Sequence, residues 1–170
     1  MVSGDTAKKA GIRGIARLAA IQALYQQEQQ QQTIDEILEE FLFYRAGTPV
    51  IGEEVHSGDK VFFTALMKGV ITEAAAIDGF IIERLTEEWT LERLDPVVRA
   101  ILRAGICELL TFKKVPACVV LNEYVELTKA FFDEKEPMFV NGVLHSVAKI
   151  LRSQEISEKD GKTFLKEQKS

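Results

Sequence analysis

Three basic residues near the start of the chain, Lys9, Arg13 and Arg17, recur at a spacing of four residues. Residues four apart lie on one side of an α-helix, so a helix that begins early enough carries them as a stripe. Such a stripe can contact successive phosphates of a nucleic acid. An ordinary charged helix face has the same pattern, and the spacing alone leaves both interpretations open. Arg99 and Arg103 repeat the spacing with the same two interpretations.

Aromatic side chains are the second group that could act on RNA, because unstacked bases pack against their faces. The candidates are Tyr25, Phe131, Phe132 and Phe139. Aromatics at helical spacing are more often part of a core. The last three flank the charged segment 133–137, which favours exposure of one of them there.

No constellation of residues indicates catalysis or metal binding. The sequence lacks a glycine-rich phosphate loop and a nucleophile elbow. His56 and His145 are far apart, so no zinc-ligand spacing exists. Cys107 and Cys118 sit among apolar residues at helical positions, which favours small core residues over a disulfide or a ligand pair. We therefore expect a protein that is not an enzyme and has no cofactor.

Composition limits the function further. The 170 residues fit one domain or two closely packed halves, and 46% of them are hydrophobic, which is ample for a core. No apolar run is long enough to span a bilayer, and the first residues lack the apolar centre of a signal peptide, so a cytoplasmic location is expected. The net charge of −5 argues against binding nucleic acid through bulk charge. An RNA footprint must therefore be small, or completed by a basic partner.

Apolar residues at three- and four-residue spacing predict an all-α protein. We expect about seven helices, within the segments 11–30, 33–42, 59–71, 74–85, 96–110, 119–131 and 139–151. Thr33 with Glu36 is typical of a capping box, and Asp95-Pro96 of a helix start.

Turn-forming residues and polarity set the predicted domain organisation. Proline, glycine and serine predict a loop at 47–58. Residues 1–152 are expected to form a single helical domain of two packed three-helix subdomains, about 11–86 and 95–152. The polar segment 153–170 is expected to be a flexible tail.

Four segments, in order, resemble the NusB family of transcription antitermination factors. They are AR at 16–17 with IQALY at 21–25, VVRAILRAGICELL at 97–110, VPACVVLNEYVELTK at 115–129 and FVNGVL at 139–144. The resemblance implies an all-α fold of two three-helix halves. It implies binding of the single-stranded boxA element of nascent ribosomal RNA, as a heterodimer with NusE, a small-subunit ribosomal protein. It also implies action with RNA polymerase and other Nus factors, and a homodimer is possible.

The resemblance assigns roles to particular residues. Arg13 and Arg17 match the family's arginine-rich start and become expected phosphate contacts, with Lys9 on the same stripe. Phe139 lies in the segment at the family's RNA surface, which implies base stacking.

Further residues flank these positions or match a partner contact. Phe131 and Lys135 flank the RNA surface of Phe139. Tyr25 matches a partner-contact position of the family. Val98 stands before Arg99, where an acidic residue associated with partner binding is common, so we place both at the partner face and expect that contact to be altered.

Two other interpretations remain open. Gly14 and Ile15 stand where family members often carry arginines, so the chain could be a helical protein-interaction module with little RNA affinity of its own. NusB-like domains also occur fused to ribosomal RNA cytosine methyltransferases. Because the chain ends soon after the last predicted helix, we expect no catalytic domain of that kind.

Overall fold

The computed structural model describes residues 11–44 and 57–156, and these residues form helices joined by short connections. The helices are α2 (Gly11–Gln30), α3 (Ile34–Glu39), the π-helical turn η1 (Glu40–Tyr44), α4 (Ser57–Thr72), α5 (Ala74–Ile82), the 3-10 turn η2 (Leu91–Arg93), α6 (Pro96–Thr111), α7 (Ala117–Phe131) and α8 (Lys135–Leu151). Within these ranges there are seven α-helices and no strand, which confirms the all-α prediction.

The capping signals in the sequence start the helices where they were expected. The Thr33 hydroxyl accepts a hydrogen bond from the backbone of Glu36 at 3.2 Å, and the Glu36 carboxylate accepts one from the backbone of Thr33 at 2.8 Å. The Asp95 carboxylate accepts from the backbone of Val97 at 2.8 Å, with Pro96 in the first turn of α6. These side chains satisfy backbone N–H groups that a helix start leaves without partners.

Two predicted boundaries were wrong. α8 begins at Lys135, so the turn after α7 is shorter than 133–137, and Pro137 lies in the first turn of α8, where no backbone N–H is required. The predicted loop at 47–58 lies outside the described residues, except for its last two residues, which belong to α4.

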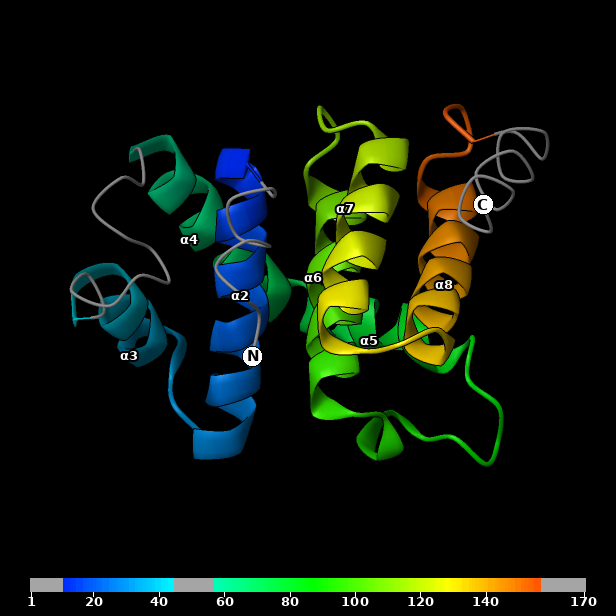
Figure 1. The fold of residues 1–170 in the computed structure, drawn as a ribbon, viewed down its shortest axis with the longest axis horizontal. Coiled ribbons are helices and arrows are strands. Elements are labelled where there is room, and N and C mark those ends of the chain that lie inside the picture. Colours follow the sequence, from blue (N-terminus) through cyan, green and yellow to red (C-terminus); the bar gives the residue numbers. More distant parts are fainter. Residues whose placement is uncertain (1–10, 45–56, 157–170) are drawn as a thin grey trace.

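Helix α6 lies at the centre of the bundle. Figure 1 shows α2, α3 and α4 on one side of it and α7 and α8 on the other. α6 packs against α2, α4, α5, α7 and α8, and its residues 98–102 and 104–109 are all buried. A helix buried on every side must be surrounded by other helices, and one continuous apolar core runs from α2 to α8. The side chains at these positions of α6 therefore have little access to an external ligand.

Close contact of α6 with α8 depends on a residue without a side chain. A Cβ atom added at Gly105 would lie 3.0 Å and 3.2 Å from the two methyl carbons of Leu144. Contacts this short are rare between real side chains. Gly105 therefore lets the two helices approach closely, which fixes the position of α8.

The two cysteines differ in environment, and one expectation for them was wrong. Cys107 is buried, and burial raises the pKa of its thiol to about 11. Cys118 was also expected to be a small core residue, but it is exposed at the start of α7. The other helices bury most of α6, including Cys107, but cover only one face of α7. No helix in the described part of the chain is long and apolar enough to cross a membrane.

The segment after α8 is held against the bundle over its first residues. The guanidinium of Arg152 pairs with Glu155 at 2.7 Å, and Glu155 accepts a hydrogen bond from the backbone of Ala117 at 3.0 Å. These two contacts lower the pKa of Glu155, with the Ala117 bond the larger cause. Ile156 packs against the core. The rest of the predicted flexible tail 153–170, from 157 onward, lies outside the described residues.

Candidate nucleic-acid and partner surfaces

The two described arginines of the basic stripe predicted at the start of the chain differ in their exposure to solvent. Arg13 is exposed on the first turn of α2, whereas Arg17, one turn further along, is only 3% exposed. Lys9 lies outside the described residues. In this structure the guanidinium of Arg17 has no surface for a phosphate, and the expectation that it contacts RNA directly was wrong.

Arg17 is buried because α6 supplies a carboxylate partner for it. Its Nε and Nη2 atoms donate to the two oxygens of Glu108, each at 2.8 Å, and both side chains are almost fully covered. Burial alone would lower the pKa of Arg17, but the hydrogen bond and the charge of Glu108 outweigh it and raise the pKa, so Arg17 stays charged. This pair joins α2 to α6. Glu108 was not singled out from the sequence, although a lone acid within ICELL is a signal for a buried ion pair.

Arg13 is positioned by an aromatic ring. Its guanidinium carbon lies 5.3 Å from the ring centroid of Phe62 on α4, and that of Arg17 lies 5.4 Å from the same centroid. Cations stack favourably on aromatic faces at such distances. Phe62 in turn contacts Phe112 edge to face, with the ring centroids 5.2 Å apart. Arg13 therefore combines an exposed charge with a supported side chain.

The predicted aromatic surface lies around the turn between α7 and α8. Phe131, Phe132 and Phe139 are half-buried and pack against the core, so each shows only part of its ring to solvent. Lys135 is exposed beside them at the first position of α8. An open hollow is lined here by Phe132, two lysines and three acids, namely Lys129, Lys135, Asp133, Glu134 and Glu136. The arrangement could present an aromatic edge to a base.

The structure places the two candidate RNA surfaces at opposite ends of the bundle. In Figure 1 the first turn of α2, in dark blue, lies at the upper end, and the yellow turn between α7 and α8 lies at the lower end. A helix of the length of α2 spans about 30 Å. A ligand that contacts both Arg13 and Phe139 must therefore run along the length of the bundle.

Of the three residues predicted at the partner face, one is exposed and two are buried. Tyr25 is 41% exposed on α2, so its side chain is available to a partner. Val98 is 3% exposed and Arg99 is 7% exposed, because both lie on the central helix α6. The prediction that Val98 and Arg99 contact a partner was wrong for this structure.

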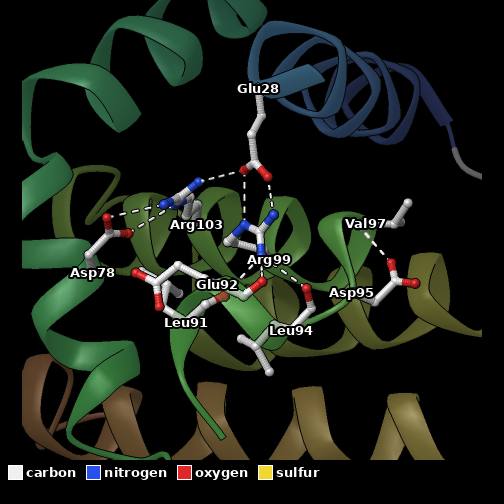
Figure 2. A network of polar contacts seen from close by, with 9 residues as sticks. All are labelled: Glu28, Asp78, Leu91, Glu92, Leu94, Asp95, Val97, Arg99 and Arg103. Atoms are coloured by element: carbon white, nitrogen blue, oxygen red, sulfur yellow. Dashed lines mark hydrogen bonds and ion pairs between the residues drawn. The ribbon is translucent and has the colours of Figure 1, made fainter. Parts of the chain in front are cut away.

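Arg99 is instead the centre of an internal polar network (Figure 2). Its Nη1 donates to the carbonyls of Leu91 and Leu94, each at 2.9 Å, and its Nε and Nη2 bind the carboxylate of Glu28. The hydrogen bond from Arg99 is the largest cause that lowers the pKa of Glu28. Arg99 thus fixes the segment that leads into α6 and joins it to the end of α2.

Arg103 extends this network to α5. It pairs with Glu28 at 3.1 Å and binds both oxygens of Asp78, at 2.9 Å and 3.1 Å. Figure 2 shows Glu28 bridging the two arginines. The spacing of Arg99 and Arg103 therefore reflects contacts within the protein, which satisfy the guanidinium groups without an external ligand.

Among the described residues, no group of three His, Cys, Asp or Glu side chains could hold a metal ion. The arrangement is that of an all-α helical-bundle protein with exposed basic and aromatic side chains at its two ends. This class includes many unrelated proteins, so the comparison with known proteins decides the family.

The profile of the NusB family matches residues 15–149. The chain is 46% identical to the transcription antitermination protein NusB of Caulobacter vibrioides, over 82% of this chain and 94% of that protein. It is 45% identical to the protein of the same name from Sinorhizobium fredii, over 89% of this chain and 95% of the relative. The chain belongs to the NusB family.

Solved structures agree with this assignment. NusB of T. maritima superposes with a TM-score of 0.69 at 31% identity, over 88% of this chain and 95% of that one. A second match, from a crystal structure of the antitermination factors NusB and NusE in complex with dsRNA, has a TM-score of 0.70 at 27% identity. It covers 82% of this chain and 97% of the matched chain.

Proposed function

We propose that this chain is a non-catalytic transcription antitermination factor of the bacterial cytoplasm. It binds the boxA element of nascent ribosomal RNA together with NusE and acts with RNA polymerase and other Nus factors. The observation that carries the proposal is the similarity over most of the chain to a NusB found in complex with NusE and RNA. The curated relatives are named as antitermination proteins and are matched over nearly their whole length.

The residues assigned to RNA follow from exposure and chemistry. Arg13 supplies a fixed charge for a phosphate, with Lys9 preceding it on the chain. Phe139 and Phe131 present partly exposed rings to bases, and Lys135 lies close enough in sequence to neutralise a phosphate beside them. Arg17 acts indirectly, because it shares the ring of Phe62 with Arg13 and pairs with Glu108.

Tyr25 is the residue assigned to the partner. It is a large aromatic side chain exposed on α2, and such residues often dominate protein interfaces. A double-mutant cycle between Tyr25→Ala and substitutions on NusE measures the coupling directly. Zero coupling with every NusE residue that matters for binding would remove Tyr25 from the interface.

The test of function is binding of a boxA RNA by the chain, alone and with NusE. Phe139→Ala should weaken binding of the RNA by about 1–3 kcal/mol, the usual value of one stacked base. Because Phe139 also packs against the core, the stability of the variant must be measured in parallel. Unchanged RNA binding by a folded Phe139→Ala variant would exclude stacking.

The same RNA titration distinguishes the proposed function from the competing one, a helical protein-interaction module. A helical interaction module without RNA affinity would bind NusE equally well and would show no difference between boxA and a scrambled RNA. Preference for boxA in the presence of NusE would exclude that module.

A further inference from the structure

The turn between α6 and α7 carries two exposed lysines, Lys113 and Lys114, at the end of the bundle where α2 begins (Figure 1). They follow Phe112, the residue that ends α6. The Phe112 ring contacts Phe62, which also supports the guanidinium of Arg13. A continuous set of contacts therefore brings basic residues from two distant parts of the sequence onto the same end of the molecule.

The turn that carries the lysines is firmly held. Arg152, which is 5% exposed, donates to the carbonyls of Leu109 at 2.8 Å, Phe112 at 2.9 Å and Val115 at 3.0 Å. Glu155 completes the attachment by accepting from the backbone at the start of α7. Charges on an ordered turn are preorganised for a ligand, since less conformational freedom is lost on binding.

Stabilisation of the end of α6 is the usual structural explanation for lysines at this position, and the contacts of Arg152 make it unnecessary. Basic residues near a helix end commonly stabilise its last carbonyl groups. At the end of α6, Arg152 already donates hydrogen bonds to the carbonyl groups of Glu108, Leu109 and Phe112. Neither lysine forms a hydrogen bond or an ion pair with another described residue. Their charges are therefore open to solvent and to a ligand.

Three acids on, or bound to, the elements joined by this turn are already engaged. Glu108 is buried in its pair with Arg17, and Glu155 is bound to Arg152 and the backbone of Ala117. Glu123 lies 3.9 Å from Arg17. Arg13, Lys113 and Lys114 thus carry three positive charges that are not paired with these three acids, in a protein whose net charge is −5.

We propose that Lys113, Lys114 and Arg13 form one surface that binds the sugar-phosphate backbone of single-stranded RNA. This inference rests on the proposed function and extends it to the α6–α7 turn. The surface contributes affinity that does not depend on base sequence, because cations on an open surface contact phosphates and not base edges. Discrimination between bases comes from the aromatic end of the bundle.

Salt dependence of RNA binding tests the surface. Each phosphate contact with a single strand contributes about 0.7 to the slope of log K against log salt. Lys113→Gln/Lys114→Gln should reduce the slope by about 1.4, which corresponds to about 25-fold weaker binding at 0.1 M salt if affinities converge at 1 M. The loss should be equal for boxA and a scrambled RNA of the same length, measured with NusE present.

Two controls distinguish the effect of where a lysine lies from the effect of removing a positive charge anywhere on the protein. Lys68→Gln removes one charge from an exposed site on α4, and it should leave the slope unchanged, whereas Lys113→Gln and Lys114→Gln each lower it by about 0.7. Lys113→Arg/Lys114→Arg should retain binding. Because both lysines are exposed, all variants should keep the wild-type thermal midpoint.

The outcomes separate the two proposals. Wild-type binding to boxA with an unchanged slope in the double variant would overturn the phosphate surface and leave the proposed function intact. An equal loss in Lys68→Gln would also overturn it, because bulk charge would then explain the effect. Failure of the wild-type chain to bind RNA with NusE would overturn the proposed function and this inference together.

Discussion

Two arginine networks join α6 to α2, and they differ in how much water reaches them. In the first, Arg17 and Glu108 form a pair whose side chains are 4% and 0% exposed, and the 30% exposed side chain of Glu123 lies 3.9 Å from Arg17. In the second, Glu28 is shared by Arg99 and Arg103, and the Glu28 side chain is 32% exposed. The same chemical groups are therefore buried in one network and partly exposed to solvent in the other.

The difference predicts different energetic roles. A buried ion pair whose partner is removed leaves an uncompensated charge, which is strongly destabilising. A partly exposed carboxylate or guanidinium can exchange a lost partner for water, so each contact contributes less. Arg99 is intermediate, because its guanidinium is buried while its partner Glu28 is partly exposed. Single substitutions can measure this order.

The largest effect is expected in the buried pair. Glu108→Gln should lower the free energy of unfolding by about 3–5 kcal/mol, because the buried charge of Arg17 then loses its buried partner and keeps only the partly exposed carboxylate of Glu123, 3.9 Å away. Urea denaturation monitored by circular dichroism measures the change. Replacement of both residues, as in Arg17→Met/Glu108→Leu, should recover much of the loss. A cost below about 1 kcal/mol for Glu108→Gln would show that water reaches this site.

A smaller effect is expected at Arg99. Arg99→Met removes the donor for the carbonyls of Leu91 and Leu94 and should cost about 1–3 kcal/mol of unfolding free energy. Arg103→Met, the matched control on the same helix, should cost about 1 kcal/mol or less, since its contacts are partly exposed. Equal costs for the two variants would contradict the distinction between buried and exposed contacts.

The smallest expected effect is in the pH dependence of stability. Contact with Arg99 lowers the pKa of Glu28 below its ordinary value of 4.5. The resulting stabilisation is fully present above about pH 4.5 and is lost as the pH falls through the lowered pKa. The difference in stability between wild type and Glu28→Gln should therefore shrink on acidification below pH 4.5. A constant difference down to pH 2 would exclude the carboxylate as its source.

Much of the fold could be predicted because its signals are local. Periodic apolar residues placed α2, α6 and α7 close to their observed bounds, and Thr33 and Asp95 began their helices as expected. Local signals were weaker before α8, where Pro137 suggested a turn but lies inside the first turn of the helix.

The candidate site was predicted less well, because surface exposure is not a local property. Spacing by four residues correctly indicated that Arg13 and Arg17 lie on one side of a helix, but it could not say what covers that side. Phe62 supports the first residue and leaves it exposed, while Glu108 draws the second into the core. Glu108 comes from a segment 91 residues away.

The sequence alone determined the helices, the family and the residue types from which a nucleic-acid surface can be made. The tertiary structure alone decided which of those residues face solvent, since that depends on the central position of α6. For this reason Val98 and Arg99 are internal, Arg13 is exposed, and Lys113 and Lys114 lie at the same end of the bundle as Arg13. A helical pattern specifies a face, and only the packing of distant segments determines whether that face meets protein or water.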